Sequence, residues 1–204
     1  MSVNVLVKIA DSRRQATVPE PSHSPLIQTW FSRAVIIKTF NVLFLCNGNS
    51  ARSILAEAIL NKEGGNRFYA YSAGSRPDTD IHPSAQALLD ELDYPMNEIR
   101  PESWNDFARE DSPPLDFVFT LADETLGELC PVWPGQPITA HWGIADPISA
   151  AADEQERAFR SAYHALQRRI RLFLSLPIDS IDEMSLRNRL EEIGEPDGEN
   201  AAAA

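Results

Sequence analysis

The stretch that decides the fold reads Thr39-Phe-Asn-Val-Leu-Phe-Leu-Cys-Asn-Gly-Asn-Ser-Ala-Arg-Ser53. Residues 39–45 are apolar and β-prone, which favours a short strand. A turn rich in Gly, Asn and Ser follows, and apolar residues then recur at helical spacing, at positions 54, 55, 58 and 59. We therefore predict a strand, a tight loop and a helix in direct succession.

Short β-prone runs alternate with helical patterns along the rest of the chain. The predicted strands cover residues 39–45, 68–73, 115–121 and 138–142, and the predicted later helices start at Pro83 and cover residues 153–176 and 186–193. Such alternation is typical of a parallel sheet covered by helices on both faces. The predicted fold class is therefore α/β, with ligands expected at the carboxyl ends of the strands.

The length of 204 residues fits one domain with some excess at its ends. Residues 1–38 combine an alternating apolar piece with a polar, proline-containing stretch that has neither helical nor strand periodicity. We interpret residues 1–38 as an N-terminal extension of unknown role and residues 39–193 as the domain. Residues 194–204 are predicted to be a disordered tail.

The composition restricts the partners that this protein can have. A formal net charge of −12 and a pI near 4.7 argue against binding to nucleic acid or to an anionic membrane. An anionic substrate would need a local positive site. The sequence has neither an uninterrupted apolar run of membrane-spanning length nor a secretory signal, and its 2 cysteines do not indicate a disulfide framework. We predict a cytoplasmic protein.

The loop after the first strand carries the chemistry, because Cys46 and Arg52 bracket it in a Cys-x5-Arg pattern. Backbone N–H groups at a strand-to-helix turn can converge on one anion, with the helix dipole behind them. A cysteine in such a place is expected to be a thiolate, and thus a nucleophile, at neutral pH. Arg52 can offer two parallel N–H donors to the anion. The predicted oxyanion-binding residues are Asn47, Gly48, Asn49, Ser50, Ala51, Arg52 and Ser53.

Residue types within the loop agree with this interpretation. Gly48 and Asn49 suit a bend that requires unusual backbone angles. The hydroxyl groups of Ser50 and Ser53 can stabilise the loop or the thiolate. The alternative is a capped helix start with a buried cysteine and a solvated arginine.

The segment from Val42 to Ala58 resembles the opening of the low-molecular-weight protein tyrosine phosphatases and of the arsenate reductases that share their fold. Further motifs resemble the arsenate reductase branch: Ser72-Ala-Gly-Ser75, His82-Pro83, Leu115-Asp-Phe-Val-Phe-Thr-Leu121, Cys130-Pro-Val-Trp-Pro134 and His141-Trp-Gly-Ile-Ala-Asp-Pro147. The resemblance covers residues 40–193 and leaves residues 1–38 without a counterpart. It implies a four-stranded parallel sheet flanked by helices, with Cys46 as the nucleophile and Arg52 as the anion clamp.

Asp146 is the candidate general acid. It precedes Pro147 on a loop expected at the same end of the sheet as Cys46, where a carboxyl group can protonate a leaving oxygen. An isolated Asp-Pro more often caps a turn, but the resemblance implies the family's acid loop. In the phosphatase branch tyrosines follow this pair, whereas Ile148 and Ser149 follow it here, which disfavours an aromatic phosphoester. Trp133 and Trp142 could replace the tyrosines, although core packing is the favoured role for both.

Cys130 is the candidate second thiol. An arsenate reductase needs one after the first cysteine has bonded arsenic, although a lone cysteine is as often an inert buried residue. Relatives that depend on thioredoxin use three cysteines, and the intermediate one corresponds to Ala122 here, so the full relay is absent. Two routes remain open: a direct Cys46–Cys130 disulfide, or attack by an external thiol such as glutathione with recovery by glutaredoxin.

Three functions are therefore compared. The leading one is thiol-dependent reduction of arsenate to arsenite, with arsenate or phosphate oxyanion and a thiol-redox protein, glutaredoxin or thioredoxin, as partners. The first alternative is a phosphomonoesterase with a phosphocysteine intermediate. The second is a non-catalytic, regulatory oxyanion-binding module. We predict no bound cofactor and no metal, because His141 and His164 have no second His or Cys at ligand spacing.

Overall fold

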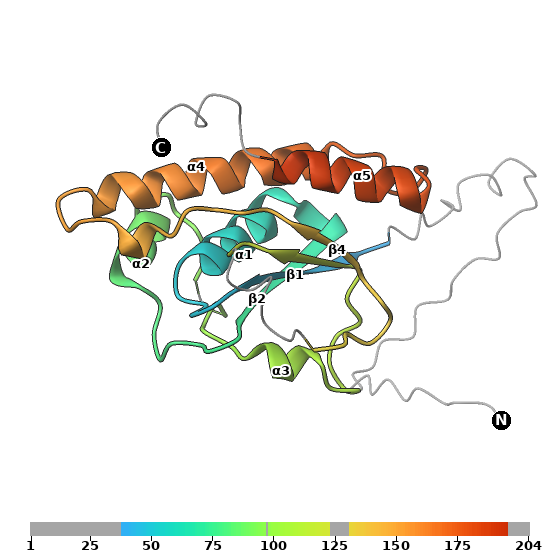
Figure 1. Ribbon diagram of the computed structural model, residues 1–204, viewed down its shortest axis with the longest axis horizontal. Coiled ribbons are helices and arrows are strands. Elements are labelled where there is room, and N and C mark those ends of the chain that lie inside the picture. The colour runs from blue at the N-terminus through green and yellow to red at the C-terminus, as the bar shows by residue number, and fades with distance from the viewer. Residues whose placement is uncertain (1–37, 97, 123–130, 196–204) are drawn as a thin grey trace, which may run out of the picture. The chain divides into compact units, whose positions relative to one another are not determined.

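The computed structural model describes residues 38–96, 98–122 and 131–195 (Figure 1). Strand β1 is Phe40–Cys46 and helix α1 is Arg52–Glu63. The predicted succession of strand, loop and helix is thereby confirmed, with Arg52 as the first residue of the helix. The predictions for residues 1–37, for Cys130 and for residues 196–204 lie outside the described residues.

The sheet has four parallel strands in the order β2-β1-β3-β4. Strand β2 is Phe68–Gly74, β3 is Phe117–Thr120 and β4 is Ile138–His141. The register pairs Cys46 with Gly74, and the β3 end at Thr120 pairs with the β4 end at His141. The carboxyl ends of all four strands therefore meet at one edge, which confirms the predicted fold class.

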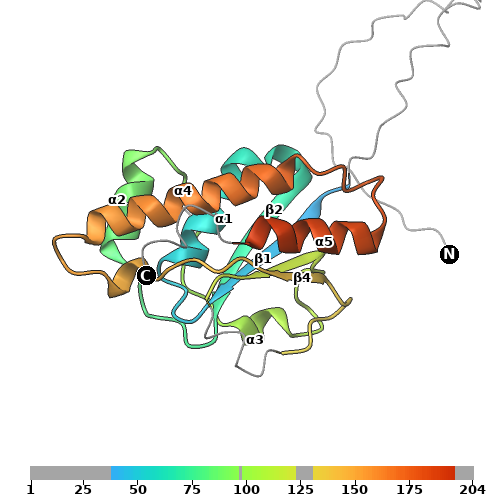
Figure 2. The ribbon, with the colours of Figure 1, turned by 45° about the horizontal axis from the view of Figure 1, so that its top comes forward.

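Helices cover both faces of the sheet unequally (Figures 1 and 2). The later helices are α2 Pro83–Glu91, α3 Trp104–Phe107, α4 Gln155–Leu174 and α5 Glu183–Gly194, with short 3₁₀ turns at η1 Gly65–Arg67 and η3 Pro147–Ser149. Both views place α4 and α5 on one side of the sheet and α3 on the other. No membrane-spanning helix occurs among the described residues, since none of their helices is long and apolar enough.

Alternation along β1 supplies two apolar cores. Val42 and Phe44 belong to the larger core, under α1, α2, α4 and α5. Leu43 and Leu45 point the other way and belong to a smaller core that includes Trp104 from α3. Because β1 is buried on both faces, its apolar run is continuous, as is typical of a central parallel strand.

Helix α5 packs against the end of β4 at Gly194. A Cβ at this position would meet the backbone oxygen of His141, so only glycine permits the close approach. Gly194, the first residue of the tail that we predicted, is the last residue of α5. The indole N–H of Trp142 also donates to the Leu190 carbonyl, at 2.9 Å.

Candidate active site

Cys46 lies at the carboxyl end of β1 and is 3% exposed. Its side chain contributes to a pocket of about 170 Å³. The lining residues are those from Cys46 to Arg52, together with Asp78, Asp146 and Ile148. The structure therefore brings together three of the residues predicted for catalysis, namely the cysteine, the arginine and the aspartate.

The loop is held from outside by the segment 75–82, which follows β2. Four backbone N–H groups of this segment donate to carbonyl groups of the loop: Ser75 to Cys46 at 3.4 Å, Arg76 to Asn47 at 3.0 Å, Asp78 to Gly48 at 2.8 Å and His82 to Ser50 at 2.9 Å. Within a peptide unit the N–H group points away from the carbonyl. The carbonyls of the loop are thus satisfied outside the pocket, and its N–H groups remain available to an anion inside.

The bend of the loop depends on Asn49 and Gly48 in different ways. Asn49 has a φ of 47°, as predicted for a residue in an unusual backbone conformation. The same prediction is wrong for Gly48, which does not have a positive φ. Glycine is needed there for space, because a Cβ would lie 2.5 Å from Oδ2 of Asp78.

A buried chain of hydrogen bonds ends at the sulfur of Cys46. The Asn49 amide donates to the hydroxyls of Ser53 and Ser72, both at 2.8 Å, and Ser53 Oγ lies 2.9 Å from Cys46 Sγ. Either atom can be the donor of this contact, but a thiolate has no proton, so Ser53 is the donor once Cys46 is ionised. A hydrogen bond from a hydroxyl group stabilises the thiolate more than the thiol. The prediction that Ser53 can support the thiolate therefore has a structural basis.

The same chain continues to Glu57, a residue that sequence reasoning missed. Ser72 Oγ donates to Glu57 Oε2 at 2.6 Å. Burial raises the pKa of Glu57 to about 8, since the hydrogen bond from Ser72, which lowers it, is the smaller effect. Glu57 is therefore largely protonated at neutral pH. An ionised Glu57 would add negative charge behind the thiolate.

Arg52 points from the start of α1 across to the loop that carries Asp146. Its Nη1 donates to the Ile144 carbonyl at 3.1 Å, and its Nη2 donates to Asp146 Oδ2 at 3.2 Å. The residue is only 7% exposed. The alternative of a solvated arginine is thereby excluded, and the guanidinium group joins the two segments that form the pocket.

Asp146 caps a turn and also lines the pocket. Its Oδ1 accepts from the Ile148 N–H at 3.1 Å and so caps the turn η3. Its Oδ2 contacts Arg52, and the side chain is 38% exposed at the pocket. One carboxylate oxygen thus fixes the rotamer while the other stays beside the anion site.

Asp78 also lines the pocket and was not predicted. Its Oδ2 accepts from the hydroxyl of Ser50 at 2.5 Å, on the exposed side of the loop. The residue lies in a polar stretch without a motif, so the sequence offers no signal for it. Ser50, which we predicted to stabilise the loop, does so through this contact.

The mouth of the pocket has no aromatic wall among the described residues. Ile148 is the exposed apolar residue there. Trp133 and Trp142 are both buried in the cores, so neither replaces the missing tyrosines. Ala122, the position of the relay cysteine in the relatives, is buried. Within residues 38–96, 98–122 and 131–195, no group of three His, Cys, Asp or Glu residues could hold a metal ion.

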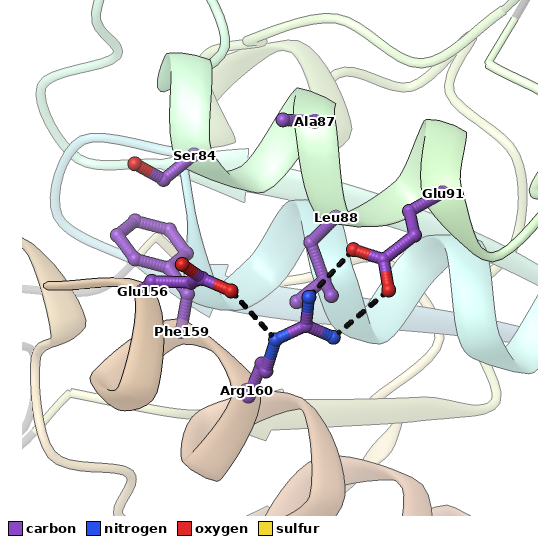
Figure 3. A pocket seen from close by; sticks show the side chains of 7 residues that line it. All are labelled: Ser84, Ala87, Leu88, Glu91, Glu156, Phe159 and Arg160. Atoms are coloured by element: carbon purple, nitrogen blue, oxygen red, sulfur yellow. Dashed lines mark hydrogen bonds and ion pairs between the residues drawn. The ribbon is translucent and has the colours of Figure 1, made fainter.

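A second hollow, between α2 and α4, does not offer an alternative anion site (Figure 3). Its one cation, Arg160, donates to both oxygens of Glu91 at 3.1 and 2.6 Å and to Glu156 at 3.2 Å. The guanidinium group is therefore surrounded by more negative charge than it carries. An oxyanion would be repelled from this hollow.

Comparison with known proteins assigns the chain to a family. The sequence model described as low molecular weight phosphotyrosine protein phosphatase matches residues 41–185. The chain belongs to this family. The matched region contains the whole pocket and leaves out the first 40 residues.

Relatives within this low molecular weight phosphatase family carry the name of a reductase. A protein of Halalkalibacterium halodurans named arsenate reductase is 30% identical over 134 residues, which cover 65% of this chain and 93% of the relative. Another arsenate reductase, from Oceanobacillus iheyensis, is 31% identical with the same coverage. These relatives match the domain and not the full chain.

Solved structures confirm the family fold. An arsenate reductase in the phosphate binding state has a TM-score of 0.55 at 24% identity and covers 67% of this chain and 98% of its own. The tyrosine phosphatase Wzb from Escherichia coli K30 in complex with sulphate has a TM-score of 0.53 at 20% identity, covering 67% of this chain and 96% of its own. Reductases and phosphatases thus share this one architecture.

Proposed function

We propose that the protein reduces arsenate to arsenite with electrons from thiols, and that Cys46 is its nucleophile. One observation carries the proposal: a buried cysteine sulfur, a guanidinium group and a carboxylate line one small pocket that has no aromatic wall among the described residues. The curated relatives named arsenate reductases support the same function. A pocket of about 170 Å³ suits a free tetrahedral oxyanion.

In the first step the thiolate of Cys46 attacks arsenic while the N–H groups of the loop and Arg52 bind the oxygens. A sulfur–arsenic bond forms and an arsenic–oxygen bond breaks. Asp146 donates a proton to the departing oxygen, which leaves as water. Arg52 already contacts Asp146, so the anion must compete with that carboxylate for the same guanidinium group.

In the second step a further thiol attacks the sulfur of Cys46. A disulfide forms, the sulfur–arsenic bond breaks, and its electron pair stays on arsenic, which is released as arsenite. The two thiols together supply the two electrons of the reduction. The donor is either Cys130 or an external thiol, with glutaredoxin or thioredoxin restoring the enzyme. We place this chemistry in the cytoplasm, where such donors are kept reduced.

The second candidate is phosphomonoester hydrolysis, which the family description favours. It shares the first step and ends with attack of water on a phosphocysteine. The described residues that line the pocket, Ile148 among them, include no aromatic side chain. This opposes hydrolysis of an aryl phosphate, which would gain binding energy from aromatic contacts.

The deciding experiment gives the purified protein arsenate, with glutathione plus glutaredoxin in one arm and thioredoxin in another, and measures arsenite. An aryl phosphate is assayed in parallel, and Cys46→Ser is the inactive control for both. We expect arsenite from the wild type in at least one arm. Hydrolysis of the aryl phosphate without arsenite formation in any arm would reject arsenate reduction in favour of the phosphatase.

A further inference from the structure

Arg169 in α4 is a buried cation whose described surroundings hold no carboxylate partner. It is 5% exposed, and its Nε is buried without a hydrogen-bond acceptor. Its Nη1 donates to the carbonyls of Gly143 at 2.9 Å and Trp142 at 3.4 Å. Its Nη2 donates to the carbonyl of Gly194 at 3.3 Å. Every described contact of this guanidinium group is thus a backbone carbonyl.

This arrangement is costly for a residue that only fills space. A buried cation without a counter-charge destabilises the folded state, and burial lowers the pKa of Arg169. The carbonyl of Gly194 at the C-terminus of α5 offsets part of that cost, because the helix end carries partial negative charge. An apolar residue at this point of the helix would destabilise the folded state less. The position of the contacted carbonyls suggests why an arginine is present.

Two of those carbonyls, from Trp142 and Gly143, belong to the segment that leads from β4 to Asp146. Arg169 binds the carbonyls of residues 142 and 143, and Arg52 binds the carbonyl of Ile144 and the side chain of Asp146. Two arginines from different helices therefore hold successive peptide units of one short loop. Arg52 also faces the anion pocket, whereas Arg169 does not line it.

Trp142 and Ile144 pack into the larger core, but side-chain packing leaves a gap on the α4 side of the loop. A hollow of about 320 Å³ lies between residues 143–147 and α4. The helix contributes mainly small side chains to it: Ala158, Ser161, Ala162 and Ala165, with Arg169 at the end. Hydrogen bonds from Arg169 therefore add to the packing of the loop beside this gap.

We propose that Arg169 is a positioning residue for Asp146, holding the acid loop from behind while Arg52 serves the oxyanion. Arg52 cannot do this alone, because the substrate competes with Asp146 for its Nη2. The contacts of Arg169 involve no group of the anion pocket and persist when the substrate binds. The proposal rests on the proposed function only in taking Asp146 as the acid.

The test compares Arg169→Lys and Arg169→Met with the wild type. Arg157→Met is the matched control, since Arg157 lies on the same helix and pairs with exposed Glu154. We expect kcat to fall roughly ten- to a hundred-fold in the Arg169 variants. A misplaced acid stabilises the transition state less but does not weaken the binding of the substrate. Phosphate protects Cys46 from alkylation, and the phosphate concentration needed for this protection reports anion binding. That concentration should change less than about two-fold. A cooperative thermal transition establishes that each variant is folded. If Arg169→Met does not fold, Arg169→Lys alone is compared with the wild type.

Combination with Asp146→Asn separates positioning from a general structural role. Arg169→Lys should lose activity in the wild-type background and cost almost nothing more once the acid is absent. Additive losses, a parallel loss of phosphate protection, or unchanged kcat would each overturn the proposal. Both arsenate and an aryl phosphate are assayed, because each needs the acid. A wild type that acts only on the phosphate would reject arsenate reduction while leaving the Arg169 comparison intact.

Discussion

The hydrogen bonds around Cys46 form one connected chain of side chains. The Asn49 amide has two protons and gives them to Ser53 and Ser72. Ser72 donates to Glu57, and Ser53 is the donor to the sulfur when Cys46 is a thiolate. Asn49, which is fully buried and has a φ of 47°, is the origin of both branches. Reactivity at the sulfur therefore depends on side chains that never touch the anion.

Replacing Ser53 by alanine should slow the alkylation of Cys46. The variant removes the proton that Ser53 directs at the sulfur, so less thiolate is present near neutral pH. A hydrogen bond to a charged group is worth about 1.5–3 kcal/mol, which corresponds to a roughly ten- to hundred-fold slower reaction with iodoacetamide. Phosphate should protect both proteins. Ser84→Ala, whose hydroxyl bonds to Gln155, is the control, and equal rates for Ser53→Ala and wild type would contradict the chain of donors.

Glu57 makes the stability of the protein fall as the pH rises. Its pKa of about 8 in the folded state lies above the ordinary value of 4.5, so between these values the folded protein binds more protons than the unfolded chain. The resulting stabilisation is complete below the ordinary pKa and is lost as the pH approaches 8. Glu57→Gln should abolish this loss and melt on the order of 5 °C higher than wild type at alkaline pH. If the melting temperatures of the wild type and of Glu57→Gln change in parallel across the pH range, the pKa of Glu57 is not raised in the folded state.

At the scale of elements, the local succession was predictable and the contacts between elements were not. β1, the loop and α1 are contiguous, so periodicity and turn residues identify them. The support from segment 75–82 depends on the parallel register that places Gly74 beside Cys46, which one sequence does not specify. The burial of Arg169 is likewise not predictable from the sequence, because Arg169 lies next to the apolar stripe of α4 and resembles a solvated residue. Its role exists only once β4 and α5 are packed against that helix.

The two glycines beside the loop should respond differently to alanine. A Cβ on Gly74 would meet the backbone oxygen of Asn47, which is fixed by the N–H of Arg76, whereas a Cβ on Gly48 would meet the mobile end of Asp78. Gly74→Ala should therefore cost about 1–3 kcal/mol in urea unfolding, and Gly48→Ala less. Adding Asp78→Ala should relieve the Gly48→Ala defect but not that of Gly74→Ala. Equal costs at the two positions would show that the loop backbone, not Asp78, limits the space.

At the scale of the whole molecule, an acidic protein binds an anion by local means. The net charge of −12 repels an oxyanion at long range, but that repulsion is screened beyond about 10 Å in ordinary salt. Within the pocket, the N–H groups and Arg52 act at contact distance. We therefore expect affinity to depend on the loop and not on the overall charge.

Removal of residues 1–38 should leave a folded, active enzyme, because the family match starts at residue 41 and β1 at Phe40. Lys38 makes the described contacts that are lost: an ion pair with Asp116 at 3.0 Å and a cation–π contact 4.5 Å from the centre of the Phe40 ring. An exposed pair of this kind contributes at most about 1 kcal/mol. A truncated protein that begins at Lys38 is the matched control. Aggregation of both proteins, or loss of the cooperative thermal transition, would show that the extension belongs to the fold.

The cysteine count makes the recycling step testable in the full chain. If Cys130 attacks the arsenic-bonded Cys46, Cys130→Ser should react once with arsenate and then stall before arsenite. Mass analysis of the wild type without reductant should then show a bridge between the two cysteines. Such a bridge requires Cα atoms within roughly 7 Å, or a backbone that moves to bring them together.

Attack by an external thiol predicts the opposite, and we favour this route because Ala122 removes the intermediate step of the relay. Cys130→Ser would keep its turnover with glutathione and glutaredoxin, and a mixed disulfide would be trapped on Cys46 alone. The thiol must then enter through the pocket mouth, since Cys46 is 3% exposed. A bulky thiol should consequently be a much poorer donor than glutathione. A wild type that consumes arsenate with thioredoxin alone and forms the internal bridge would establish Cys130 as the second thiol instead.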